Sequence, residues 1–317
     1  MTTRGVVLPI VSKRGGEIFP ASSLTVVPSM GAPKIHAGAH IQGHVFANGA
    51  EFCEAIPEGG GARAWHQGTW ATDKGREEFT GTRSMHAAKA LFSAPPQSLR
   101  DKAESAAQSL APIAPMRHKL HSWNIAGAYP SVGRALSGEP RAMRAVSWQK
   151  SPKMVTLICN VVIPWNIKAS VLIDFSAAMG ATIDRLEDSG WRVEVWAAQI
   201  AISDSDFVGG SLVRLKASED STDMAKLVAG LGHPSFLRRL CFGYASVTSA
   251  LKPLGDAMGY SAEILPPDDV SGVYCTSLSA AYETITDAKR KPTAQNFLAE
   301  IAATLGRQGF AGFSEEP

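Results

Sequence analysis

The sequence lacks a charge imbalance and contains little cysteine. Its 31 lysine and arginine residues nearly balance 29 aspartate and glutamate residues, which gives a formal net charge of +2 over 317 residues. No global electrostatic field therefore draws the chain to nucleic acid or to a membrane surface. The cysteines are few, far apart and without a C-x-x-C pair, so we expect buried free thiols rather than a disulfide framework. They are Cys53, Cys159, Cys241 and Cys275.

Long apolar runs and the common nucleotide and hydrolase motifs are also missing. The longest apolar run, MVTLICNVVIPW at 154–165, is too short to cross a bilayer, and the N-terminus has no apolar segment of the signal-peptide kind. We therefore expect a protein of the cytoplasm. No P-loop and no G-x-S-x-G sequence occurs, so we do not expect nucleotide hydrolysis. We expect no cofactor, and an enzyme is the least favoured class of function.

What the sequence does contain is a change of pattern near residue 150. The region 1–150 is rich in glycine and turn residues, and we predict a mixed α+β region in which 123–148 is a loop with two short helices. From 151 to 317, apolar runs dense in β-branched residues alternate with helical patterns. This alternation predicts an α/β domain with a largely parallel central sheet flanked by helices, similar to von Willebrand factor A (VWA) or Rossmann domains. The N-terminal region is expected to pack on that domain.

The stretch VLIDFSAAMG at 171–180 has two interpretations. As a strand and turn, Asp174 and Ser176 would begin the D-x-S-x-S metal site of VWA domains. As a helix over 169–188, the stretch places an apolar stripe on one face and turns Asp174 toward solvent. The second serine of the metal motif is replaced by Ala178, so the helix is the favoured prediction and no tightly held divalent metal is expected. The stripe is Leu172, Phe175, Met179, Ile183 and Leu186.

Acidic residues lie in two of the predicted loops, 202–210 and 264–272. Asp204 and Asp206 lie after the strand at 191–201, and Asp268 and Asp269 lie in a PPDD sequence. Because ligands gather at the carboxyl ends of parallel strands, we expect the two loops to converge there and to bind a basic partner surface. A cation site formed by Asp204, Asp206 and Asp268 is the weaker alternative, and ordinary turn formation is the simplest.

Three further groups of side chains are candidates for binding. His36, His40 and His44 are spaced by four residues, which is a possible metal-ligand pattern, although the glycines between them argue against a helix. Arg238 and Arg239 are predicted to lie on the polar face of a helix. With a basic run they offer contacts to phosphate and support nucleic-acid binding, although a solvated surface is the commoner role of such residues. The run consists of Lys289, Arg290 and Lys291.

Three segments carry a family resemblance, namely FTGTRSMHAAKAL, WNIAGAYPSVGRALSGEPRAM and LGHPSFLRRLCF. Over about residues 78–245 the chain resembles a family of phage and prophage proteins of unknown function, similar to VWA domains that have lost the metal motif. The resemblance implies a non-enzymatic adaptor that binds a protein partner, such as an AAA+ ATPase of the MoxR class or another phage component. It identifies no catalytic residue. A virion or structural assembly protein is the first alternative, and a nucleic-acid-binding protein is the second.

Overall fold

The computed structural model describes most of the chain in separate stretches. The described residues are 6–12, 23–28, 40–57, 77–107, 118–126, 129–149, 153–164, 166–203, 207–254, 260–266, 272–308 and 310. The strand expectations at 191–201, 211–218 and 273–278 all fall on observed strands. The four cysteines are free and buried, as the sequence predicts.

Among the described residues, eight strands form one sheet in the order β10-β2-β1-β3-β9-β8-β7-β11. Strands from both sides of residue 150 belong to it, so the first 150 residues contribute to the central sheet itself rather than only packing on it. The strands are β1 (Val6–Ser12), β2 (Ser23–Pro28), β3 (His40–Phe46), β7 (Lys153–Asn160), β8 (Trp191–Ile202), β9 (Phe207–Lys216), β10 (Tyr260–Leu265) and β11 (Val273–Ser277).

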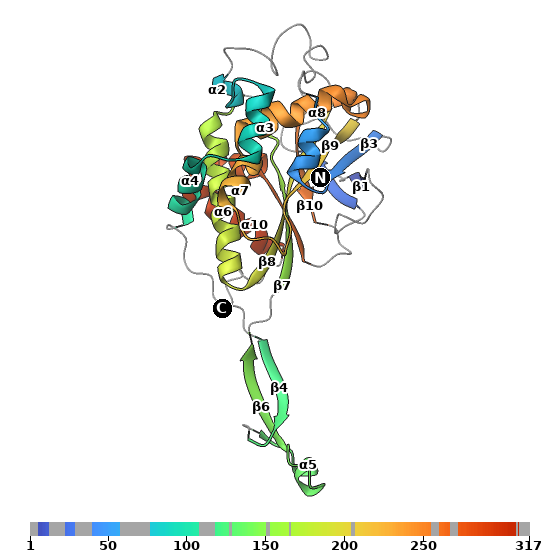
Figure 1. Cartoon of the computed structure of the whole chain (residues 1–317), viewed down its shortest axis with the longest axis vertical. Helices are drawn as coiled ribbons and strands as arrows, with labels where there is room; N and C mark the ends of the chain where they lie inside the picture. Colours follow the sequence, from blue (N-terminus) through green and yellow to red (C-terminus); the bar gives the residue numbers. More distant parts are fainter. Residues whose placement is uncertain are drawn as a thin grey trace.

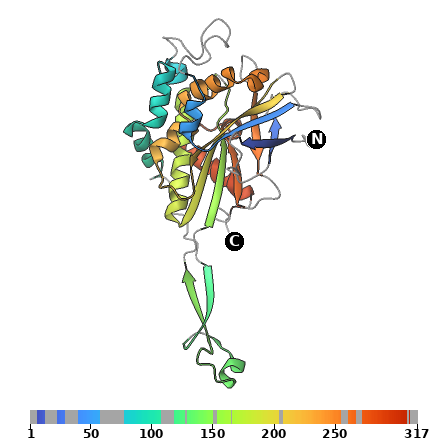
Figure 2. The same ribbon diagram turned by 45° about the vertical axis from the view of Figure 1, so that its right-hand side comes forward.

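The sheet is mixed and strongly curled, so the prediction of a largely parallel central sheet flanked by helices is wrong. Strand β7 is parallel to β8 and β11, but β9 is antiparallel to β8. The chain has only residues 203–206 between β8 and β9, whereas a parallel connection needs a dozen residues or more. Strand β10 pairs antiparallel with both β2 and β8, which curls the sheet into a half-barrel (Figure 2).

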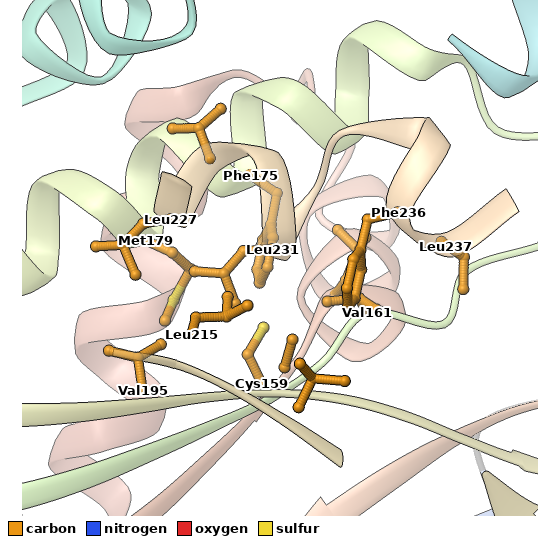
Figure 3. Packing of buried hydrophobic residues seen from close by; sticks show 14 of the residues in the cluster. Cys159, Val161, Phe175, Met179, Val195, Leu215, Leu227, Leu231, Phe236 and Leu237 are labelled. Carbon is orange, nitrogen blue, oxygen red and sulfur yellow. The ribbon is translucent and has the colours of Figure 1, made fainter. Parts of the chain in front are cut away.

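Two apolar cores occupy the two faces of this sheet. One lies within the curl and includes Val26, Trp196 and Ile264. The other lies between the opposite face and the helices, where Figure 3 shows Phe175 and Met179 above the sheet. The helices of the body are α1 (Gly49–Glu54), α2 (Glu77–Thr80), α3 (Met85–Ser93), α4 (Gln97–Ala107), α6 (Ala169–Asp188), α7 (Met224–Leu231), a π-helix η1 (Phe236–Cys241), α8 (Phe242–Val247), a 3-10 helix η2 (Ser249–Leu254), α9 (Leu278–Asp287) and α10 (Ala294–Arg307).

Helix α6 has the bounds that its apolar stripe predicts. The stripe residues are buried against the sheet, and the helix connects β7 to the parallel strand β8. Asp174 is half-buried rather than solvated, because α4 covers this side of α6 and places Lys102 near it. Desolvation raises the pKa of Asp174, and the positive charge of Lys102 partly opposes that rise. The stretch at 171–180 therefore belongs to a packed helix and not to a strand and metal-binding turn.

Two helix caps expected from the sequence are present. The Ser84 side chain accepts a hydrogen bond from the backbone N–H of Ala87 at the start of α3, and Thr293 accepts one from Asn296 at the start of α10. Such caps satisfy backbone donors that have no partner within the helix. They fix where each helix begins on the surface of the body.

Residues 118–149 form an arm that projects from the body (Figure 1). Strands β4 (His118–Asn124) and β6 (Met143–Gln149) pair antiparallel along their whole length, and the short strand β5 (Tyr129–Pro130) pairs with the start of β6. Helix α5 (Val132–Leu136) lies at the far end. The prediction of a loop with two short helices over 123–148 is therefore wrong, because this segment builds a separate three-stranded sheet.

Candidate functional site

The acidic residues expected to bind a partner lie outside the described residues. These are Asp204, Asp206, Asp268 and Asp269. The strand ends beside them are described, and they do not meet at one edge. Because β10 is antiparallel to β8, the beginning of β10 lies beside the end of β8 at Ile202, and the end of β10 points the opposite way. The expected convergence of the two loops depended on parallel strands, which are not present at this point of the sheet.

Arg238 and Arg239 lie in the interior and not on a polar helix face. Their exposed fractions are 2% and 0%. Arg238 donates to the carbonyl oxygens of Phe79 at 3.1 Å and Ile167 at 2.7 Å, and its guanidinium lies 4.2 Å from the centre of the Phe79 ring. Arg239 Nε donates to the carbonyl oxygen of Thr82 at 2.9 Å. Both side chains hold the segment before α3 against η1, so neither offers a contact to phosphate.

The basic run Lys289, Arg290 and Lys291 is exposed between α9 and α10. It is the part of the expected nucleic-acid surface that reaches solvent. Lys289 has a positive φ of 56°, and its backbone N–H donates to the carbonyl oxygen of Thr286 at the end of α9. The run therefore also forms the turn that ends α9.

The three expected histidine ligands do not form a described cluster. His36 lies outside the described residues, and the side chain of His40 does too. His44 is buried, and its Nδ1 lies 2.6 Å from the hydroxyl of Tyr244. Where the structure is described, no group of three or more His, Cys, Asp or Glu side chains is placed to hold a metal ion. His44 therefore links β3 to α8 through a hydrogen bond.

The end of the arm exposes large apolar side chains. Ile125, Val132 and Leu136 are 74%, 68% and 83% exposed, respectively. Val132 and Leu136 are four residues apart in α5, so they lie on the same side of that helix. Arg134, between them, forms an ion pair with Glu139. We call these residues the arm tip: Ile125, Val132, Arg134, Leu136 and Glu139.

The arm tip was not predicted from the sequence, because the pattern of this segment favours a loop. The available signal was a pair of seven-residue stretches, HKLHSWN and MRAVSWQ, separated by glycine and proline. Two stretches of strand length with turn residues between them indicate a hairpin. Exposed large apolar residues that gather at one point of a protein commonly mark a contact with another molecule.

A second feature is an acidic cleft of about 300 Å³ between β10, β11, α9 and α10. Four carboxylates line it, and the opposing cation is Arg307. Arg307 donates to Glu300 at 3.0 Å, so the buried carboxylate of Glu300 is neutralised while the other acidic residues leave the cleft negative. The carboxylates belong to Glu263, Glu283, Asp287 and Glu300.

The lining of the acidic cleft also has an apolar part. Ile264, Cys275 and Ala281 are buried and contribute to it. The outward backbone groups of Cys275 are already paired, since its N–H donates to Gln308 Oε1 at 2.9 Å and its carbonyl accepts from Gln308 Nε2 at 2.7 Å. The Gln308 amide therefore takes the place of a neighbouring strand at this edge of the sheet. A ligand of the cleft would be recognised by its side chains and not by strand addition at Cys275.

The buried thiols are poor nucleophiles. Desolvation raises the pKa of Cys53 to about 11, although the nearby Lys89 lowers it in part. Desolvation is also the largest cause of the raised pKa values of Cys159, Cys241 and Cys275. Because the thiolate is the reactive form, these residues act as apolar core side chains.

Comparison with known proteins gives a family but no described relative. The model of a family described as "Domain of unknown function (DUF7192)" matches residues 43–304. No curated protein and no solved structure matches the chain. Among the helices that the structure describes, none is both long enough and apolar enough to span a bilayer.

Proposed function

We propose that this chain, which belongs to the DUF7192 family of unknown function, is a non-enzymatic protein-binding subunit that contacts its partner through the arm tip. The observation that carries this proposal is the exposure of Val132 and Leu136 at the end of a projecting hairpin. Removing an aliphatic side chain from water stabilises the buried state by roughly 1.5–3 kcal/mol. Two such side chains at one point supply a useful part of the free energy of binding.

The arm best supports a role as one component of a larger assembly. A projecting hairpin can reach a neighbouring subunit while the body keeps its own core. The resemblance to phage and prophage proteins at LGHPSFLRRLCF and two earlier segments is consistent with a phage or prophage structural role. We propose that the chain acts in the host cytoplasm, or within the virion once assembly is complete.

An adaptor for a MoxR-class AAA+ ATPase is the second candidate. The acidic cleft favours it, because a negative surface with an apolar lining suits a basic segment of a partner protein. Complementary charge would raise the rate of association and would make it sensitive to salt. Of the basic residues expected to contact nucleic acid, the exposed ones are Lys289, Arg290 and Lys291.

Photo-cross-linking from the arm tip tests the proposed function. A photoreactive benzoylphenylalanine is placed at Leu136, and in a matched control at Glu219, an exposed residue of the body. After irradiation of cells that natively encode the chain, we expect discrete protein adducts from Leu136 and few from Glu219. Equal adduct yields from both positions, or adducts with nucleic acid alone, would contradict a protein-binding arm tip.

A further inference from the structure

We propose that the arm tip of one copy of this chain docks in the acidic cleft of a second copy. This inference rests on the proposed function, and it identifies both the partner and the surface that receives the arm. The contact would join two different surfaces, so each copy would offer an arm to one neighbour and a cleft to another.

The charges of the two surfaces are complementary. Between His118 and Gln149 the arm contains one acidic residue, Glu139, and four basic residues. The cleft has the opposite balance, with four carboxylates and Arg307 as the opposing cation. The arm and the lining of the cleft therefore carry opposite local excesses of charge, although the chain as a whole is nearly neutral. The basic residues of the arm are Lys119, Arg134, Arg141 and Arg144.

The arm tip also has an apolar part, and the lining of the cleft includes apolar residues. Val132 and Leu136 present a narrow aliphatic surface on a short helix. The cleft has a volume of about 300 Å³, and the buried side chains of Ile264 and Ala281 lie in its lining beside the carboxylates. An aliphatic side chain entering the cleft would bring Arg134 and Arg141 near the carboxylates at its opening.

The geometry of the arm favours a separate molecule as the receiver. Strands β4 and β6 have seven residues each, which at about 3.4 Å per residue corresponds to roughly 24 Å. In both views the arm extends away from the body (Figures 1 and 2). The arm tip therefore lies away from the cleft of its own chain and is available to a neighbour.

A contact between two different surfaces has a defined consequence for assembly. Contacts of this head-to-tail kind continue from copy to copy and produce a ring if the rotation closes, or an open filament if it does not. Damage to either surface in every copy should leave only monomers. A mixture of copies damaged at different surfaces should stop at the dimer.

Sedimentation velocity on purified full-length variants tests this inference. The arm variant carries Val132→Asp and Leu136→Asp, and the cleft variant carries Glu263→Lys and Asp287→Lys. The control variant carries Asp188→Lys and Glu219→Lys, which change the net charge by the same amount away from the cleft. Asp188 ends α6 as Asp287 ends α9, so the helix-end context is matched. Far-ultraviolet circular dichroism verifies that each variant is folded.

We expect the wild type and the control to associate as concentration rises, and more strongly at low salt. Each damaged variant should associate at least roughly tenfold more weakly, because apolar burial or charge complementarity is lost. The mixture of arm and cleft variants should form a one-to-one dimer and nothing larger.

A wild type that stays monomeric at every concentration would overturn the inference. So would a cleft variant that assembles normally, since the arm tip would then have another receiver. In either case cross-links from Leu136 to a different protein would leave the proposed function intact. If Leu136 formed no cross-links to any protein, both this inference and the proposed function would be contradicted.

Discussion

At the scale of single residues, the largest corrections concern polar side chains that are buried. Arg238 and Arg239 follow the sequence pattern of a solvated helix face, yet both donate to backbone carbonyls in the interior. Their burial depends on the segment before α3, which packs on them from about 160 positions earlier in the chain. Periodicity within one helix cannot reveal a neighbour of this kind.

The buried side chain of His233 predicts that the stability of the protein depends on pH. Burial of its ring, with a smaller effect of Lys102, lowers its pKa from the ordinary 6.5 to about 4. Between these two values the unfolded chain binds the proton more readily than the folded chain does. The contribution of His233 to the free energy of unfolding is therefore fully present above pH 6.5. It is lost as the pH falls toward 4, and the total loss is at most roughly 3 kcal/mol.

Urea denaturation at pH 7.5 and pH 5 measures this effect. We expect the wild type to lose more stability between the two pH values than a His233→Asn variant does. Asparagine cannot be protonated in this range but keeps a side chain that can form a hydrogen bond with Ser235, which contacts His233 Nδ1 at 2.7 Å. Identical losses in both proteins would show that His233 does not carry this pH dependence.

For helices and strands, the local sequence pattern predicts well where an element lies but predicts poorly in which direction a strand runs relative to its neighbours. The helix at 169–188 and the strand at 191–201 are confirmed, because their apolar spacing is set by the surface they bury. The direction of β9 depends on the short connection at 203–206, and the curl depends on β10 pairing with two strands. The arm was not predicted for a related reason. Each of its strands is stabilised by the other, and glycine and proline occupy five of the 18 positions between them.

The close pairing of β8 with β9 predicts that a side chain at Gly210 lowers the stability of the protein. Gly210 has a φ of 156°, and a Cβ atom there would lie 1.5 Å from the carbonyl oxygen of Gln199 on β8. Gly210→Ala should therefore push the two strands apart and lower the free energy of unfolding by at least roughly 3 kcal/mol.

Gly133→Ala is the matched control, since a Cβ atom at Gly133 has no atom within 4 Å. Alanine in that helical position should be neutral or slightly stabilising, by about 0.5–1 kcal/mol for the arm helix itself. Thermal unfolding of the two variants distinguishes them. Equal stability of both would mean that β8 and β9 are not as closely paired at Gly210 as described.

The whole molecule consists of a body that folds around two cores and an arm that, as we propose, presents a contact surface. The curled sheet and its helices bury the apolar residues of the body. The arm tip leaves Val132 and Leu136 exposed instead. The sequence indicated a binding role through acidic loops, whereas the described structure draws attention to the arm tip and the acidic cleft.

Disulfide trapping tests most directly whether the arm tip of one copy occupies the acidic cleft of another. One variant carries Leu136→Cys at the arm tip, and a second carries Thr284→Cys on the exposed part of α9 that lines the cleft. The native cysteines are buried, and their raised pKa values keep them unreactive under mild oxidation.

We expect a mixture of these two variants to form a disulfide-linked heterodimer, and we expect added salt to reduce its yield. Neither variant alone should give a comparable dimer. The contradicting result would be a yield no higher than that of Leu136→Cys mixed with Glu219→Cys, which places the second thiol on the body away from the cleft.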